Sequence, residues 1–276
     1  MGTFYENLQI ARDHLKKKEI ADADLDSWYL LAYVLGLSRS EFFLRREEQL
    51  PEDQAARYHS LVEQRANHIP LQYITGSQEF MGLEFEVNEH VLIPRQDTEL
   101  LVEEVQKECS GKTVLDLCTG SGCIIISLAR LGNIAKATAV DISDKALELA
   151  VRNAKKHQVK VDFIESDLYE KVSGVFDIIV SNPPYIRTGE IEALMPEVRK
   201  HEPQIALEGG ADGLIFYRRI IEGLRSHLTE NGRVFFEIGC DQAEAVKQLL
   251  AQEGFEEIVV RKDFSGLDRV ISAWKP

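Results

Sequence analysis

The sequence Val114-Leu-Asp-Leu-Cys-Thr-Gly-Ser-Gly-Cys123 decides how the second part of the chain folds. A short apolar run leads into two closely spaced glycines, Gly120 and Gly122, and the helical pattern of residues 123–131 follows. A strand, a glycine-rich turn and a helix in this order predict a ligand site, because glycine lets the backbone approach a ligand closely. The free N–H groups at the start of the helix favour a carboxylate or a phosphate there.

Strands and helices alternate on both sides of this turn. The predicted strands are 113–117, 136–140, 161–164, 176–180, 233–238, 258–260 and 270–274, and the predicted helices are 123–131, 144–157, 212–227 and 242–252. The last two strands are expected to pair antiparallel. The fold class is therefore α/β, a Rossmann-like sheet of seven strands with helices on both faces, and ligands bind at the carboxyl ends of its strands.

The chain of 276 residues is long enough for two domains. Residues 1–70 show apolar residues at helical spacing, so they predict an N-terminal helical-bundle domain. Residues 71–95 are punctuated by glycine and proline and predict a β-hairpin linker. Residues 96–276 form the predicted α/β domain.

Two acids identify the ligand of the glycine-rich loop. Asp141 ends the next strand, about twenty residues further on, where a ribose hydroxyl acceptor is expected. Asp116 lies inside the loop itself, where it would repel a dinucleotide pyrophosphate and attract the ammonium group of S-adenosylmethionine. The full GxGxxG pattern is missing because Ile125 takes the last position. The residues therefore favour S-adenosylmethionine, with S-adenosylhomocysteine as its product, over NAD.

Two further segments follow the third and fourth predicted strands. Asp167 is a candidate acceptor for the adenine amino group, with Leu168 packing on the ring, and a solvated loop acid is the alternative. Residues 182–185 read Asn-Pro-Pro-Tyr. The Asn182 side-chain oxygen and the Pro183 carbonyl can accept the two N–H groups of an amide, in a turn that its prolines stiffen. Tyr185 offers a flat face to a planar amide or base.

Composition limits the partners. The net charge of -14 argues against a general nucleic-acid binder, which needs a Lys/Arg-rich surface. The four cysteines form no CxxC pair, so we expect reduced thiols and no metal site. The N-terminus lacks the apolar core of a signal peptide, and no apolar run is long enough to cross a bilayer. A cytoplasmic protein without a membrane partner is expected.

The loop DLCTGSG, Asp141 and Asn-Pro-Pro-Tyr together resemble the amino-methyltransferases of the seven-stranded S-adenosylmethionine-dependent class. Segments 69–87 and 91–103, the stretch 196–214 and the ending KDFSGLDRVISAW are similar to the peptide chain release factor glutamine methyltransferases. This resemblance covers essentially the whole chain. It implies that the substrate is the glutamine of the Gly-Gly-Gln loop in bacterial class I release factors and that the product is N5-methylglutamine. It also implies that the N-terminal domain helps to hold the release factor.

The resemblance assigns roles to individual residues. It implies that the cofactor is bound by Cys118, Thr119, Gly120, Ser121, Gly122, Asp141, Asp167, Leu168 and Asn182, and that the glutamine amide is bound by Asn182, Pro183, Pro184 and Tyr185. Asn182, Pro183 and Tyr185 are the implied catalytic residues. Arg95 and Glu99 are placed in a loop that borders the cleft, where structural roles are equally expected.

Three positions depart from the family pattern. Cys118 stands where the family usually has glycine, and we expect that this position does not need a positive φ. Gln96 replaces a common proline, and His201 replaces a frequent tyrosine.

Three alternatives remain open. The enzyme could modify a glutamine of a ribosomal protein, or it could methylate a nucleic-acid base flipped into the same pocket. The chain could also be a binding module that keeps the fold and has lost the reaction, although Asn182 and the loop glycines are present.

Overall fold

The computed structural model describes residues 2–276, and these residues divide into two compact units. One unit comprises residues 2–76 together with 195–201, and the other comprises residues 77–194 together with 202–276. The segment 195–201 thus belongs with the N-terminal helices, although it follows the Asn-Pro-Pro-Tyr motif in the sequence.

The helical unit is built from α1 (Phe4–Lys17), α2 (Ala23–Leu35), α3 (Arg39–Arg45), α4 (Glu52–Ala66), α5 (Leu71–Thr75) and α9 (Pro196–His201). Thr3 and Ser38 begin α1 and α3 with reciprocal capping boxes, which satisfy the free N–H groups of the first turn. Leu15, Leu30 and Tyr58 are completely buried in the centre of this unit.

The second unit contains one large sheet and a hairpin. Within residues 77–276 the sheet strands are β3 (Thr113–Leu117), β4 (Lys136–Asp141), β5 (Asp162–Glu165), β6 (Phe176–Ser181), β7 (Leu228–Glu237), β8 (Glu256–Lys262) and β9 (Asp268–Trp274). Their order is β5-β4-β3-β6-β7-β9-β8, and β9 runs antiparallel to both β7 and β8. The predicted Rossmann-like class and the antiparallel final pair are confirmed.

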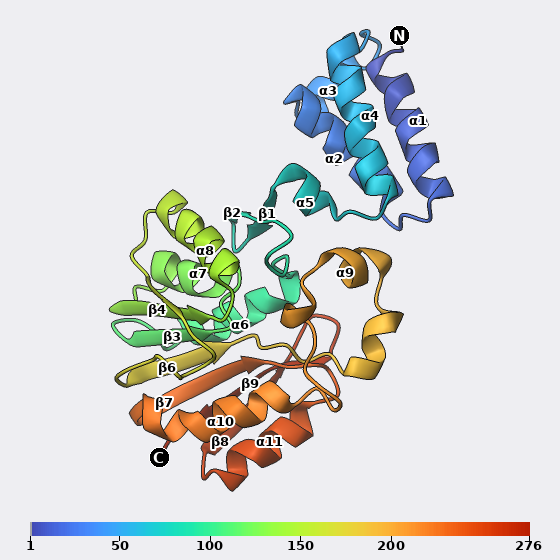
Figure 1. The fold of residues 1–276 in the computed structure, drawn as a ribbon. Helices are drawn as coiled ribbons and strands as arrows, with labels where there is room; N and C mark the ends of the chain where they lie inside the picture. The colour runs from blue at the N-terminus through green and yellow to red at the C-terminus, as the bar shows by residue number, and fades with distance from the viewer. Residues whose placement is uncertain (1) are drawn as a thin grey trace. The chain divides into compact units, whose positions relative to one another are not determined.

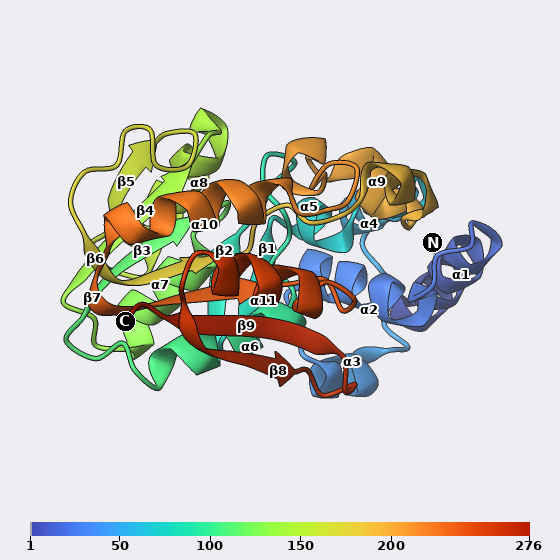
Figure 2. The ribbon, with the colours of Figure 1, turned by 90° about the horizontal axis from the view of Figure 1, so that it is seen from below.

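Helices cover both faces of this sheet (Figures 1 and 2). The bounds are α6 (Gln96–Gln106), α7 (Cys123–Leu131), α8 (Asp144–Lys156), α10 (Ile215–His227) and α11 (Ala243–Gln252). Consecutive residues of β3 point to opposite faces, so Val114 packs with α6 and α7 whereas Leu115 packs with α10 and α11. Burial on both faces explains why the strands read as continuous apolar runs.

The hairpin of β1 (Ser77–Phe80) and β2 (Leu83–Glu86) is attached to α8 through one buried amide. The Asn153 side chain donates to the Glu86 carbonyl and accepts from the Glu86 N–H. The same amide nitrogen donates to the Ser121 carbonyl at 2.9 Å. Asn153 therefore joins the hairpin to the glycine-rich loop.

Four parts of the second unit differ from the sequence-based expectation. Helix α6 was not among the predicted helices. Strand β7 begins at Leu228, because a register irregularity accommodates the turn-like residues 229–232 within the strand. Helix α10 begins only at Ile215, because Gly213 has a φ of 75° and cannot continue a helix. The 3₁₀ turns Thr188–Ala193 and Gln204–Ala206 were not predicted, because these segments show no apolar periodicity.

Candidate active site

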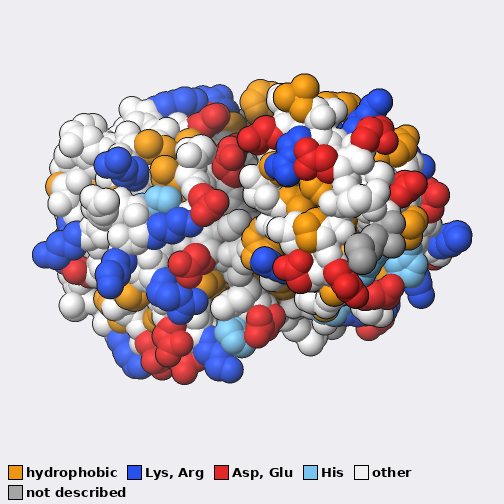
Figure 3. All heavy atoms as spheres, turned by 90° about the horizontal axis from the view of Figure 1, so that it is seen from above, with side chains coloured by type: hydrophobic (Ala, Val, Ile, Leu, Met, Phe, Trp, Pro, Cys, Tyr) orange, Lys and Arg blue, Asp and Glu red, His pale blue; other side chains and the backbone are white. Residues whose placement is uncertain are grey.

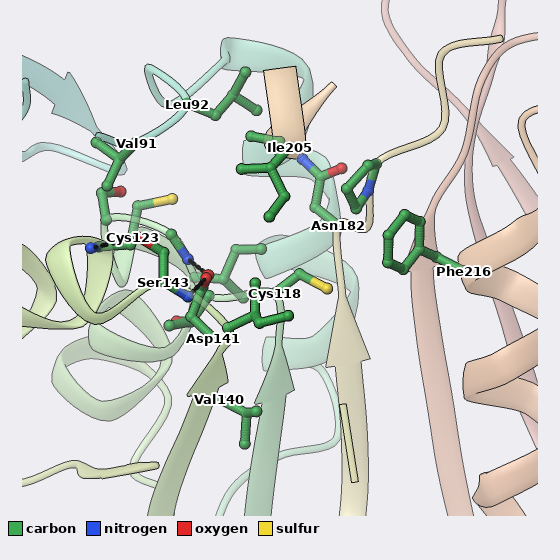
Figure 4. A pocket seen from close by; sticks show the side chains of 18 of the residues that line it. Val91, Leu92, Cys118, Cys123, Val140, Asp141, Ser143, Asn182, Ile205 and Phe216 are labelled. Carbon is green, nitrogen blue, oxygen red and sulfur yellow. Dashed lines mark hydrogen bonds between the residues drawn. The ribbon is translucent and has the colours of Figure 1, made fainter. Parts of the chain in front are cut away.

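A pocket lies at the carboxyl ends of β3, β4 and β6, on either side of the point where the strand order reverses (Figure 4). Nine residues predicted from the sequence line it: Cys118, Thr119, Gly120, Ser121, Asp141, Asp167, Leu168, Asn182 and Pro184. This is the position at which open α/β sheets bind their ligands. Gly122, Pro183 and Tyr185 do not line this pocket.

The loop after β3 uses three residues with positive φ. Cys118 has a φ of 61°, Gly120 of 54° and Gly122 of 80°. The expectation that Cys118 avoids this region is therefore wrong. A Cβ is crowded by its own backbone at such angles, so Cys118 keeps a conformation that glycine would adopt at lower cost. Strained residues of this kind concentrate at ligand-binding sites.

The two glycines of the loop do different things. A Cβ on Gly120 would meet nothing within 4 Å, so its backbone faces open space in the pocket. A Cβ on Gly122 would lie 2.8 Å from Ile126 Cδ1 and 3.2 Å from Ala150 Cβ. Gly122 thus allows α7 and α8 to approach the loop closely.

Asp141 at the end of β4 shapes the loop (Figure 4). One carboxylate oxygen accepts the Gly120 N–H at 2.8 Å, and the other accepts the Ser143 N–H at 3.0 Å. Burial raises the pKa of this carboxyl, and the backbone donors at Ser143 and Gly120 oppose that rise. Each oxygen can accept a second hydrogen bond. The carboxylate can therefore hold the glycine-rich loop and still receive a ribose hydroxyl.

Asp116 does not reach the pocket. Asp116 is completely buried. Its Oδ2 accepts a hydrogen bond from the Thr119 hydroxyl at 2.6 Å, and its Oδ1 has no hydrogen-bond partner. Burial raises the pKa of Asp116 to about 7, against the lowering effect of the Thr119 hydroxyl. Asp116 therefore cannot make the direct contact with an ammonium group that the sequence suggested. It stabilises the loop through its hydrogen bond with Thr119.

The segment after β5 forms another wall of the pocket. Leu168 is buried, lines the pocket and has a φ of 48°. One oxygen of the neighbouring Asp167 accepts a hydrogen bond from Arg219 of α10 at 2.8 Å. Arg219 and Phe216, both from α10, also line the pocket. Asp167 therefore has a structural partner and one oxygen left for a ligand.

The Asn-Pro-Pro-Tyr segment follows β6 and places Asn182 in the pocket wall beside the glycine-rich loop (Figure 4). The Asn182 Nδ2 lies 3.3 Å from the Thr98 hydroxyl oxygen. The Tyr185 hydroxyl lies 3.2 Å from Glu237 Oε1, and the Tyr185 ring packs against the apolar core beneath α10 and α11. Tyr185 is thus part of the structure behind the pocket wall, and its ring does not line the pocket.

Sequence reasoning did not predict several lining residues, such as Thr98, Phe216 and Arg219, nor Glu237, which accepts from Thr98 behind the pocket. Thr98 lines the pocket from the first turn of α6, and Glu237 ends β7 with 2% of its surface exposed. A buried acid at the end of a predicted strand was the one available signal. Arg95 lines the pocket and pairs with Glu202. Glu99 is not in a loop, since it belongs to α6 and accepts the Met81 N–H at 2.6 Å.

Residues 2–276 contain neither a metal-binding cluster nor a membrane-spanning helix. No group of three or more His, Cys, Asp or Glu side chains among them is arranged to hold a metal ion. None of the helices in that range combines the length and the apolar character needed to cross a membrane.

The sheet order, the loop after β3, the acid at the end of β4 and the Asn-Pro-Pro-Tyr segment after β6 define an S-adenosylmethionine-dependent methyltransferase. Solved structures share this fold. A methyltransferase from Pyrococcus furiosus matches 71% of this chain and 90% of its own, with a TM-score of 0.56 and 19% identity. A T. thermophilus 16S rRNA methyltransferase, in complex with AdoMet and guanosine, matches 72% of this chain and 50% of its own, with a TM-score of 0.53 and 21% identity.

Sequence comparison is more specific. Residues 6–76 match the family model of the PrmC N-terminal domain, and residues 95–210 match that of the methyltransferase small domain. The release factor glutamine methyltransferase of Geobacter sulfurreducens is 42% identical over 98% of this chain and 95% of its own. That of Agrobacterium fabrum is 41% identical over 98% of this chain and 97% of its own. The chain belongs to the release factor glutamine methyltransferase family.

Proposed function

We propose that this protein transfers the methyl group of S-adenosylmethionine to the side-chain amide nitrogen of the glutamine in the Gly-Gly-Gln motif of bacterial release factors. One observation carries the proposal. The rigid Asn-Pro-Pro-Tyr segment places the Asn182 amide in the same pocket as the glycine-rich loop and Asp141. Full-length relatives of about 40% identity that are named release factor glutamine methyltransferases support the choice of substrate.

The pocket has what S-adenosylmethionine requires. The backbone of Cys118–Ser121 would face its methionine part, the Asp141 carboxylate would accept from the ribose, and Leu168 with the free oxygen of Asp167 would contact the adenine. The open space above Gly120 and the unused lone pairs of Asp141 fit such a ligand. When bound, S-adenosylmethionine supplies an electrophilic methyl group.

The protein must hold a weak nucleophile. The lone pair of an amide nitrogen is delocalised into its carbonyl, so the site has to orient it. The Asn182 side-chain oxygen would accept one N–H of the glutamine. The Pro183 carbonyl, which does not line the cofactor pocket, would accept the other from a glutamine that enters beside that pocket, and together they would direct the lone pair toward the methyl donor. The proton leaves after alkylation has made the nitrogen acidic. Pro184 completes the wall beside Asn182.

The helical unit of residues 2–76 and 195–201 is assigned to recognition of the release factor, and the α/β unit to chemistry. Direct nucleic-acid binding is not part of this proposal. The net charge is -14, and on the face shown in Figure 3 the Lys and Arg side chains are interspersed with Asp and Glu. A phosphate backbone needs a continuous basic surface. A protein that modifies translation factors would act in the cytoplasm.

The test is transfer of a labelled methyl group from S-adenosylmethionine to a purified bacterial release factor. A release factor with Gln→Ala in its Gly-Gly-Gln motif and a duplex DNA serve as the parallel acceptors. Label on the intact release factor alone supports the proposal. Label on the variant to the same extent, or on DNA, would overturn the proposed substrate.

A further inference from the structure

Behind Asn182, three consecutive hydrogen bonds connect Asn182 to Tyr185 through the buried carboxylate of Glu237. Asn182 Nδ2 donates to Thr98 Oγ1 at 3.3 Å. The Thr98 hydroxyl donates to Glu237 Oε2 at 2.6 Å. The other carboxylate oxygen, Oε1, accepts the Tyr185 hydroxyl at 3.2 Å. Glu237 therefore contacts both ends of the Asn-Pro-Pro-Tyr segment, directly at Tyr185 and through Thr98 at Asn182.

The chemistry of these groups fixes the direction of the chain. The Thr98 hydroxyl donates to Glu237, and an ionised Glu237 carboxylate can only accept, so in that state the single hydroxyl proton of Thr98 points to Glu237. The Thr98 oxygen is then left as an acceptor, and only the NH₂ end of the Asn182 amide can satisfy it. The carbonyl end, Oδ1, becomes the end available to a ligand in the pocket that Asn182 lines.

The pKa of Glu237 is raised by burial, and three neighbouring groups oppose this rise. Glu237 and Thr98 are each 2% exposed. Burial raises the pKa of Glu237, whereas the Thr98 hydroxyl, the positive charge of Arg269 and the Tyr185 hydroxyl lower it and the negative charge of Asp97 raises it. Arg269 on β9 is itself held by Asp97 and Asp263.

We infer that Thr98 and Glu237 are positioning residues that hold the Asn182 amide in the one orientation that presents a hydrogen-bond acceptor to the substrate nitrogen. This inference rests on the proposed function. Without these hydrogen bonds, the Asn182 amide can rotate by 180° and present its NH₂ group, which would face the N–H groups of a glutamine and repel them. The sequence gives no hint of this relay, since its members are separated by 52, 84 and 139 residues.

Two substitutions at position 98 distinguish the effect of the hydroxyl on turnover from the effect of the side-chain shape. Thr98→Val has nearly the same shape and removes the hydroxyl, so turnover should fall roughly 10-fold, the effect of one lost hydrogen bond of about 1.4 kcal/mol. Thr98→Ser keeps the hydroxyl, and its turnover should stay within about 2-fold of the wild type. The dissociation constant of S-adenosylmethionine, measured by calorimetry, should change by less than about 2-fold in both variants.

A double-mutant cycle with Asn182→Ala distinguishes positioning from general damage to the wall. If Thr98 acts through Asn182, Thr98→Val should cause no further loss of turnover once the Asn182 amide is absent. An additive loss in the double variant, or equal turnover of Thr98→Val and Thr98→Ser, would overturn the inference. Failure of the wild type to methylate the release factor would instead refute the proposed function, so the two failures are distinguishable.

Discussion

Cys118 occupies the left-handed region of backbone space although it carries a Cβ. For an ordinary residue this conformation costs roughly 1–2 kcal/mol relative to glycine. Cys118 retains this unfavourable conformation because the turn between β3 and α7 requires a positive φ at position 118, as it does at Gly120 and Gly122. The pocket wall therefore carries a thiol at a position where glycine would be the residue of least backbone strain.

The strain at Cys118 predicts an inversion of the usual order of alanine and glycine. At most positions, alanine stabilises a folded protein by about 0.5–1 kcal/mol relative to glycine, because glycine loses more backbone entropy. At position 118 we expect Cys118→Gly to be more stable than Cys118→Ala, by about 0.5–1 kcal/mol. Urea denaturation of both variants measures the difference. A more stable alanine variant would show that the loop relaxes to accommodate a Cβ.

Asp116 predicts a dependence of stability on pH. Its pKa of about 7 in the folded protein exceeds the ordinary value of 3.8, so between these values the folded state binds a proton that the unfolded state has released. The free energy of unfolding therefore falls as pH rises through this window, by an amount on the order of 4 kcal/mol. Asp116→Asn removes this component and should be more stable than the wild type at pH 8.

The comparison that isolates Asp116 is the difference between variant and wild type at two pH values. Thermal or urea unfolding at pH 8 and at pH 5 should give a stabilisation by Asp116→Asn that is larger at pH 8. Other titrating groups contribute to both proteins and cancel in this difference. The same difference at both pH values would mean that Asp116 does not titrate in this window.

Among the secondary-structure elements of residues 77–276, the apolar periodicity predicted all seven sheet strands and four of the five helices that cover the sheet, and α6 was not predicted. Runs such as residues 113–117 and 123–131 have these bounds in the structure, because each is mostly apolar and is flanked by glycine or polar residues. The segment 186–214 was not predicted, since its turns are held by contacts with distant residues and show no period of their own.

The site was predictable where its residues form short motifs or, like Asp141, follow such a motif at a characteristic spacing. Loop residues 118–121 and the Asn-Pro-Pro-Tyr segment form short motifs, and both supply residues to the pocket. Thr98 and Glu237 were missed because nothing in the local sequence relates a threonine in α6 to a glutamate at the end of β7. Their relation depends on the packing of α6 against β7, and therefore on tertiary structure.

The segment 207–213 supports the Asn-Pro-Pro-Tyr turn from behind. The N–H of Ile186 donates to the Leu207 carbonyl at 2.9 Å, and the N–H of Gly209 donates to the Ile186 carbonyl at 2.8 Å. A Cβ on Gly209 would lie 2.7 Å from Tyr185 Cα and 2.8 Å from the Pro184 carbonyl oxygen. Both contacts are with backbone atoms, so the motif itself would have to shift.

Gly209→Ala should therefore lower turnover by roughly 10- to 100-fold, because catalysis is sensitive to displacements well below 1 Å. It should also destabilise the protein by about 1–3 kcal/mol, as expected for an overpacked contact. Steady-state kinetics and urea unfolding measure the two effects. Gly189→Ala is the control, since a Cβ there would meet nothing within 4 Å. Equal kinetics of the two variants would exclude the supporting role.

At the scale of the whole molecule, the chain leaves the α/β unit after residue 194 and returns to it at residue 202. The intervening helix α9 is held in the helical unit by Arg65, which is 5% exposed in its side chain and bonds both Asp26 at 2.6 Å and Glu197 at 2.5 Å. Pocket residues lie in the sequence on either side of this segment, Asn182 before it and Ile205 after it. If the helical unit recognises the release factor as proposed, the anchoring of α9 should affect binding of that substrate.

Glu197→Gln removes the charge that anchors α9. Backbone amides of residues 196–201 should exchange hydrogen roughly 10-fold faster, since one charge-assisted hydrogen bond is weakened. KM for the release factor should rise several-fold, with a smaller change in kcat. Hydrogen exchange followed by mass spectrometry measures the first effect. The control is Glu48→Gln, whose pair with Arg45 is exposed. Unchanged exchange in α9 would show that Arg65 does not hold it.

In the proposed reaction, Asn182 presents a hydrogen-bond acceptor to the side-chain amide of a release factor glutamine. Fragmentation mass spectrometry of the release factor after reaction locates the methyl group. We expect one methyl group on the side-chain nitrogen of the Gly-Gly-Gln glutamine, added roughly 10²–10³-fold more slowly by Asn182→Ala, which still binds S-adenosylmethionine normally. A methyl group on another residue or atom, or an unaffected Asn182→Ala variant, would contradict it.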